Sequence, residues 1–206
     1  MFDDSFPLTS LEGVVMKPLN LLLASLMGSA LLLSPLRAED PQAKPAEKLV
    51  EIEIQDIKLK LPESWKQQPP ENKLRLAQFT APMAEADNEA PTLVVSSFAG
   101  GTSAQNMGRW TAEFKDSVKI VSKKGESPVG PYEVTEISGS YAGPSFRRRP
   151  APLENGRAVN FVLMPKEKPF YYLKLTGPAK SVDAAAKTLR AAFGADPKKE
   201  KDVERE

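Results

Sequence analysis

Apolar and polar residues alternate along residues 49–61, and this period of two constrains the fold more than any other feature of the chain. Val50, Ile52 and Ile54 fall on one side of an extended segment, and glutamates take the other side. The alternation returns at 57–61, where lysines take the outer positions. Because opposite charges on the two outer faces can pair across a hairpin, we expect two adjacent strands here.

Most of the remaining chain also has strand character, and only two segments have a helical period. Further strands are expected at residues 74–80, 93–98, 132–141, 158–164 and 170–175. Helical spacing relates Met107, Trp110, Phe114 and Val118, and again Val182, Ala185, Ala186, Leu189 and Phe193, with Gly194 as the C-cap. Tyr171 and Tyr172 are neighbours on an expected strand, so we expect one in the core and one at the surface. The pattern predicts an α+β domain with a largely antiparallel central sheet.

The segment that begins at Met16 has the character of an export signal. Lys17 supplies a positive charge, an apolar run of 15 residues follows at 19–33, and Ala38 offers a small residue for cleavage. A bilayer span needs about 20 residues, so the run suits a signal peptide at 16–38. An uncleaved membrane anchor is the alternative. Residues 1–15 carry negative charge where export favours positive charge, and our hypothesis is that they reflect a mis-assigned start.

The two ends of the expected mature chain lack an apolar period. Residues 39–48 are rich in Pro, Ala and charge, and we interpret them as a flexible linker. Residues 195–206 have almost no apolar side chains, and we expect a charged, disordered tail. A single α+β domain at 49–194 lies between them, and we expect it to be a monomer.

Composition excludes several kinds of chemistry and of partner. The chain has no Cys and no His, so it can form no disulfide, no thiolate nucleophile and no Ser-His-Asp triad. The 28 Lys and Arg residues nearly balance 27 Asp and Glu residues, which argues against nucleic acid as a partner. The loop at 85–89 is rich in carboxylates but lacks the order of a calcium loop. We therefore expect neither a metal nor another cofactor, and no catalytic residue.

The glycines at 100–101 stand between an expected strand and an expected helix, where many proteins bind phosphate. Neither phosphate-binding glycine motif is present, however. Thr102 is a favourable N-cap, and Gln105 completes a capping box three residues later. We interpret this stretch as a capped corner, with an anion site at the helix N-terminus as the alternative.

Three adjacent arginines, Arg147, Arg148 and Arg149, lie in a Pro-rich connection between two expected strands. They are the first candidates for a contact with an acidic partner. The alternative is a solvated hairpin tip, since adjacent side chains point in different directions.

Several of these segments occur in the order found in one protein family. IKLKLPESW at 57–65, RLAQFTAP at 75–82, LVVSSFAGG at 93–101 and YYLKLTGPAKSV at 171–182 together resemble a group of exported, mostly uncharacterised bacterial proteins with a fold similar to Mog1 and PsbP. The resemblance implies a central antiparallel sheet with helices on both faces, an α/β/α sandwich. It also suggests protein binding, because Mog1-like and PsbP-like proteins bind a small GTPase and a photosystem, respectively.

These observations favour an exported, non-enzymatic protein-binding or accessory module of the cell envelope, periplasmic or extracellular, with an unknown protein partner. After signal cleavage no membrane span is expected. One alternative is a small hydrolase or lyase that uses no His or Cys, which would need a concave pocket with titratable groups of shifted pKa. Another is a structural envelope protein tethered by an uncleaved signal.

Overall fold

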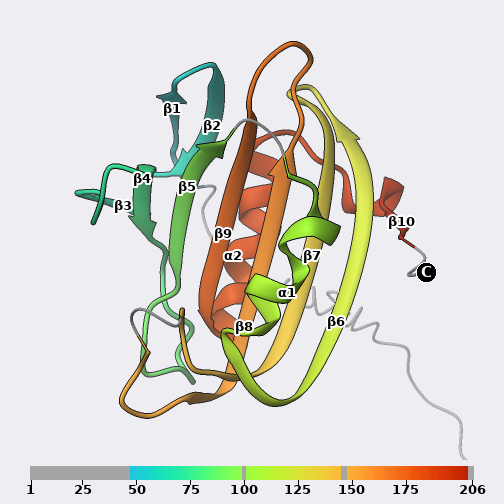
Figure 1. Cartoon of the computed structure of the whole chain (residues 1–206). Helices are drawn as coiled ribbons and strands as arrows, with labels where there is room; N and C mark the ends of the chain where they lie inside the picture. The colour runs from blue at the N-terminus through green and yellow to red at the C-terminus, as the bar shows by residue number, and fades with distance from the viewer. Residues whose placement is uncertain (1–46, 99–100, 145–147, 204–206) are drawn as a thin grey trace, which may run out of the picture. The chain divides into compact units, whose positions relative to one another are not determined.

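Ten strands and two α-helices follow one another along the chain in a computed structural model, which describes residues 47–98, 101–144 and 148–203 (Figure 1). The strands are β1 (Leu49–Ile54), β2 (Ile57–Pro62), β3 (Lys66–Gln68), β4 (Arg75–Thr80), β5 (Thr92–Phe98), β6 (Phe114–Ser127), β7 (Gly130–Tyr141), β8 (Leu153–Leu163), β9 (Phe170–Pro178) and β10 (Lys201–Asp202). The helices are α1 (Ser103–Thr111) and α2 (Ala179–Ala192), with a 3-10 turn, η2, at Pro197–Lys199. Residues 1–15, which we take as a mis-assigned start, the signal peptide proposed at 16–38, and residues 39–46 of the proposed linker lie outside the described residues.

Eight of the strands form one sheet in the order β10-β6-β7-β8-β9-β5-β4-β3, and every neighbouring pair is antiparallel. Strands β1 and β2 form a separate hairpin. In this hairpin the Nζ of Lys58 lies 2.8 Å from the Oε1 of Glu51, which confirms the expected pairing of the outer charges. The prediction of a mostly antiparallel sheet with two helices is therefore confirmed.

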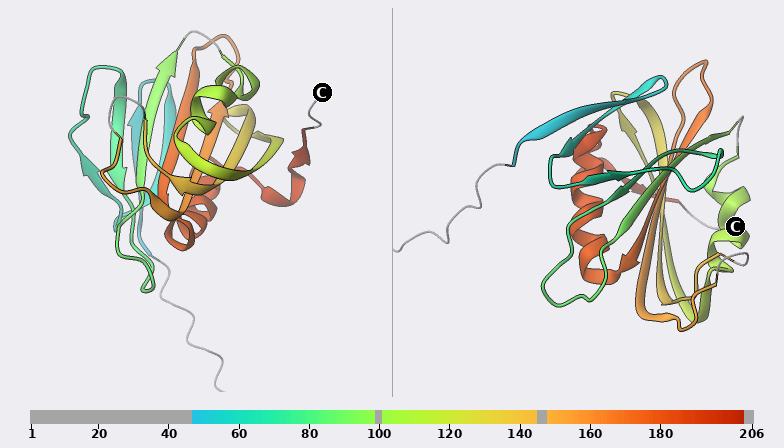
Figure 2. Two further views of the ribbon diagram at one scale, coloured as in Figure 1. Left: turned by 60° about the horizontal axis from the view of Figure 1, so that its bottom comes forward. Right: turned by 90° about the vertical axis from the view of Figure 1, so that its left-hand side faces the viewer.

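The two helices contact different faces of the large sheet, as both views in Figure 2 show. Helix α2 buries Val182 and Leu189 in the larger core, together with alternate residues of β5, β8 and β9 such as Val95 and Leu173. Helix α1 contributes Trp110 to a smaller cluster on the other face, with Ile137 of β7 and other residues. Because α1 has only nine residues, this cluster covers only one part of that face of the sheet.

Tyr171 and Tyr172 are both buried, contrary to the expectation of one exposed ring. They do point to opposite faces, since Tyr171 packs in the larger core and Tyr172 in the smaller cluster. A neighbouring pair on a strand divides into core and surface only where one face of the sheet is wet. At this end of β9 both faces are covered.

The first helix is shorter than its apolar period predicts. It ends at Thr111, and Phe114 and Val118 belong to β6 instead of continuing the helix. Strand β6 pairs with β7 over most of its length, with an irregularity between Lys115 and Lys119 where Asp116 has a φ of 60°. The long ladder with β7 outweighs the local helical spacing, because β6 offers Val118 and Ile120 at a period of two as well.

Residues 195–203 are ordered against the domain, and the prediction of a disordered tail is wrong for them. Strand β10 pairs with Lys123 and Lys124 of β6, and the side chain of Glu200 is only 2% exposed. Its carboxylate accepts hydrogen bonds from Arg190 and from the Tyr132 hydroxyl. The low content of apolar residues therefore did not indicate that this segment packs against the domain through one buried carboxylate, that of Glu200.

In the part of the chain that the structure describes, none of the helices is long and apolar enough to cross a membrane.

Candidate functional site

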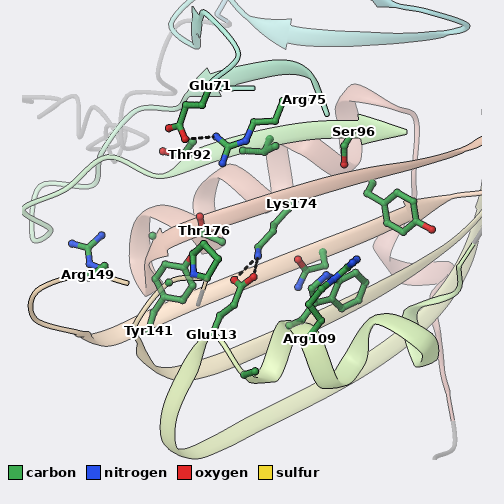
Figure 3. A pocket seen from close by; sticks show the side chains of 18 of the residues that line it. Glu71, Arg75, Thr92, Ser96, Arg109, Glu113, Tyr141, Arg149, Lys174 and Thr176 are labelled. Carbon is green, nitrogen blue, oxygen red and sulfur yellow. Dashed lines mark hydrogen bonds and ion pairs between the residues drawn. The ribbon is translucent and has the colours of Figure 1, made fainter. Parts of the chain in front are cut away.

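A pocket of about 1010 Å³ lies on the face of the large sheet that carries α1 (Figure 3). Helix α1 packs over β6 and β7, and its Trp110 shares the smaller cluster with Tyr172 of β9. The rest of β9, and β5 and β4 beyond it, are left uncovered by α1 on this face. Side chains from these strands form the floor, the end of α1 forms one wall, and residues 143–144 and 148–151 form another. The pocket is therefore the part of this sheet face that the short helix does not cover.

The floor is polar because of strand alternation. On β9, Leu173 and Leu175 point into the larger core, while Lys174 and Thr176 point into the pocket. Strand β5 repeats the pattern, with Leu93 and Val95 in the core and the side chains at 92, 94 and 96 in the pocket. One sheet thus presents an apolar face to α2 and a mostly polar face to the pocket.

Lys174 and Glu113 form an ion pair in the middle of the pocket, where Figure 3 shows both side chains pointing toward each other. Glu113 follows α1 directly, and its side chain is only 8% exposed. Its backbone is fixed at both ends, since its N–H donates to the Trp110 carbonyl and its carbonyl accepts from the Ala142 N–H. Burial lowers the pKa of Lys174, the charge of Glu113 opposes this shift, and the charge of Arg109 adds to it.

Tyr141, at the end of β7, lines the same pocket beside this pair. Burial and, after it, the negative charge of Glu113 raise the pKa of Tyr141 to about 12. Its hydroxyl forms hydrogen bonds with the side chains of Thr176 and Glu113. At neutral pH Tyr141 is therefore a neutral hydroxyl, which donates its hydrogen bond to the Glu113 carboxylate.

Asn160 of β8 lies next to Lys174 in the register of the sheet and also lines the pocket. It is 1% exposed, and its Nδ2 donates a long hydrogen bond of 3.5 Å to the Thr135 carbonyl. Its Oδ1 is buried without a hydrogen-bond partner among the described residues. Buried polar atoms rarely lack a hydrogen-bond partner. The Oδ1 of Asn160 can therefore accept a hydrogen bond from a ligand in the pocket beside Lys174.

The carboxylates that line the pocket are all neutralised, whereas two of its guanidinium groups carry no ion pair within the described ranges. Glu71 pairs with Arg75 at 3.1 Å, Glu89 pairs with Arg149, and Glu113 pairs with Lys174. Two more arginines, Arg109 and Arg148, line the pocket and are exposed. The lining therefore carries five basic and three acidic side chains, an excess of two positive charges.

Arg109 is positioned by the start of its own helix. Its guanidinium donates to the Oδ1 of Asn106, and the Nδ2 of Asn106 donates to the Thr102 carbonyl at 2.9 Å. Asn106 is itself buried, so it holds one edge of the guanidinium on the helix. The remaining N–H groups of Arg109 can reach a ligand without first releasing a protein carboxylate.

The arginine triplet of the sequence analysis lies at the opposite wall. Arg148 and Arg149 both line the pocket, and Arg147 lies outside the described residues. Arg149 is not a solvated tip residue, because its Nη1 donates to Glu89 at 2.9 Å and a second contact joins the same two groups. Whether this loop contacts a partner stays a prediction.

The sequence analysis missed Lys174, Glu113, Tyr141, Arg109 and Asn160. They come from four different elements and from the turn after α1, and only the register of the sheet brings them together. Lys174 did carry a signal, since it interrupts the apolar run of β9 at an alternating position. The remaining four have no local signal.

The stretch from Gly101 onward is a capped helix start, as predicted, and Gly100 lies outside the described residues. Thr102 and Gln105 form the full capping box. The carboxylate of Glu133 accepts from the N–H of Ser103 at 2.8 Å, so a side chain of the protein already occupies the helix N-terminus. The hydroxyl of Tyr172 donates to the Gly101 carbonyl at 2.5 Å.

No metal centre is apparent in the part of the chain described, where no group of three or more acidic side chains converges.

The fold and the pocket together define a class of protein: an α+β module whose sheet has an apolar core under α2 and, on the other face, a smaller hydrophobic cluster under α1 beside a largely polar pocket. Among solved structures, the chain is similar to the solution structure of cyanobacterial PsbP (CyanoP) from Synechocystis sp. PCC 6803, with a TM-score of 0.44 and 10% sequence identity over 79% of this chain and 100% of that chain. PsbP is one of the two proteins that the sequence resemblance names. No family model and no curated protein matches the chain.

Proposed function

We propose that the protein is an exported, non-enzymatic accessory module of the cell envelope, with a Mog1/PsbP-like sandwich fold, that binds acidic groups of a partner protein in the pocket beside α1. One observation carries the proposal. The pocket has two exposed guanidinium groups, Arg109 and Arg148, that form no ion pair in the described parts of the chain, while its three carboxylates are already paired. Such a surface attracts an acidic partner and orients it on approach.

One titratable group of the pocket, Tyr141, supports binding over catalysis. A general acid or base works best when its pKa lies near the working pH. The pKa of Tyr141 is raised to about 12, and Lys174 is held by the carboxylate of Glu113. Tyr141 therefore keeps its proton at neutral pH and is better suited to hold a ligand than to transform it. Burial lowers the pKa of Lys174 against the opposing charge of Glu113, so the Lys174–Glu113 pair is the feature that the alternative, a hydrolase or lyase without His or Cys, would use.

Crosslinking in the living cell tests the proposed function. The protein is produced in its natural host in three forms: unaltered, R109Q/R148Q, and K60Q/K168Q. The last variant removes the same charge from a second hollow, at the C-terminal end of α2, where Lys60 and Lys168 are exposed. It therefore removes the same number of positive charges at a different place on the protein.

The proposal requires that some crosslinked envelope proteins fall by about fivefold or more with R109Q/R148Q and persist with K60Q/K168Q. Equal recovery from all three forms would refute the pocket as the binding surface. Fractionation of the same cells, with N-terminal sequencing of the exported form, tests export and cleavage after Ala38. A form that resists extraction at alkaline pH would instead indicate a tethered protein.

A further inference from the structure

We propose that the pocket binds an extended peptide segment that carries two carboxylates four residues apart, one bound by Arg109 and the other by Arg148. This inference rests on the proposed function, because it identifies what the partner presents to the pocket.

Arg109 and the loop that carries Arg148 lie at opposite ends of the pocket along β9. At one end, burial raises the pKa of Tyr172 and the nearby charge of Arg109 opposes that shift. At the other end, Arg148 adjoins Arg149, whose charge acts on the pKa of Tyr141 beside Thr176. Figure 3 shows Arg109 and Arg149 on opposite sides of the Lys174–Glu113 pair.

The length of the pocket follows from the strand beneath it. Its floor runs along β9 from Tyr172 through Lys174 to Thr176. At about 3.3 Å per residue, these four steps span about 13 Å. An extended peptide that lies along the strand has the same rise, and its residues i, i+2 and i+4 point to one side. Carboxylates at i and i+4 therefore reach both ends of the pocket.

The middle of the pocket fits an uncharged residue. Lys174 and Glu113 neutralise each other there, and the adjacent floor contains the half-buried Val94. At the Arg109 end, Phe98 is 40% exposed and its ring packs edge-on against Tyr172 at 5.5 Å. A small or apolar side chain at i+2 would meet an apolar contact and no net charge.

A peptide fits these features better than other anions do. A volume of about 1010 Å³ is at the upper end of the range for small-molecule sites, about 300–1,000 Å³, so a single small anion would leave the pocket largely empty. A polyuronate, such as polygalacturonate, carries a charge on every unit. Such a chain would place a negative charge beside Glu113 in the middle of the pocket, where Lys174 is already paired. Charges at the two ends alone avoid this repulsion.

Fluorescence anisotropy with defined peptides tests the inference on the purified, exported protein. The probe is a labelled nine-residue Ser/Ala peptide with Glu at its third and seventh positions. Two isomers of the same composition carry the Glu residues adjacent or three positions apart, and an oligogalacturonate serves as the saccharide probe. We expect the four-residue spacing to bind about fivefold more tightly than either isomer. R109Q and R148Q should each remove this preference, and K60Q/K168Q should retain it.

The alternative outcomes separate the inference from the proposed function. Equal affinities for all three peptides, still lowered by R109Q/R148Q, would overturn the spacing and leave the pocket standing as a binding surface for acidic groups. Tighter binding of the oligogalacturonate would overturn the peptide in favour of an acidic saccharide. Affinities that R109Q/R148Q leaves unchanged would overturn the spacing, and unchanged crosslinking with the same variant would overturn the proposed function as well.

Discussion

Replacing Glu200 by Ala removes the only carboxylate of the C-terminal segment that is buried in the described structure. Its Oε1 lies 2.7 Å from the Nε of Arg190 and 3.1 Å from the hydroxyl of Tyr132. Arg190 also donates to Glu136 at 2.8 Å, and its guanidinium lies 5.0 Å from the centre of the Phe161 ring. Burial alone would lower the pKa of Arg190, but its hydrogen bonds to Glu200 and Glu136 raise it.

The expected cost follows from what each partner loses. Removing one member of a buried ion pair costs about 3–5 kcal/mol when the other charge is left unpaired. Arg190 keeps Glu136, which brings the cost toward the lower end of that range, while the Tyr132 hydroxyl loses its acceptor. We expect E200A to lower the free energy of unfolding by about 3 kcal/mol. E200Q keeps an acceptor oxygen and loses only the charge, so we expect about 1 kcal/mol.

Urea denaturation followed by circular dichroism measures both changes. E85A is the matched control, because Glu85 is an exposed carboxylate in a loop, and its removal should change the stability by less than about 0.5 kcal/mol. If E200A falls within the same limit, the carboxylate is not held against Arg190. The segment at 195–206 would then be the solvated tail that its composition predicts.

Three further predictions concern the corner before α1, the pocket and the start of α2. Gly101 has a φ of 107°, and a Cβ there would lie 2.8 Å from the Tyr172 hydroxyl. G101A should therefore lower the free energy of unfolding by about 1–3 kcal/mol in urea denaturation. G108A is the internal control, since a Cβ at Gly108 meets nothing within 4 Å and helix propensity should raise stability by up to about 1 kcal/mol. The pKa of Tyr141 is raised in the folded state, so its contribution to stability is present below pH 10 and is lost as the pH rises toward about 12. Over this pH range Y141F should therefore lose less stability than the unaltered protein, as measured by denaturant titrations. Asp87 accepts from the backbone N–H of Ser181 at the start of α2, and D87N should cost about 1 kcal/mol in the same assay.

Features that depend on neighbouring residues could be predicted from the sequence. The capping box needs only Thr102 and Gln105, three residues apart, and the β1–β2 hairpin needs only an alternation on each side of a short turn. The C-cap at Gly194 is equally local, with a φ of 79° and a hydrogen bond from the Ala195 N–H to the Arg190 carbonyl. In each case the interacting groups lie within one turn or one hairpin.

Features that depend on distant partners could not be predicted. Phe114 fits the helical spacing of α1, yet it belongs to β6, because the ladder with β7 is formed by residues that follow later in the chain. Glu200 has no apolar neighbours to indicate burial, and its acceptor role depends on Tyr132, 68 residues earlier in the sequence. Composition predicts such a segment from its average polarity and cannot detect a single buried carboxylate.

The pocket could not be predicted from the sequence either, because its floor consists of strand positions that the alternation assigns to solvent. Thr92, Ser96, Lys174 and Thr176 occupy the polar positions of alternating strands, which a period-based interpretation assigns to solvent. That assignment holds only if nothing else covers the face. Here Trp110 and the end of α1 rise beside these strands and turn a wet surface into a concave one, with Glu113 placed over Lys174. The same alternation that builds the apolar core under α2 therefore builds the candidate binding surface on the opposite face.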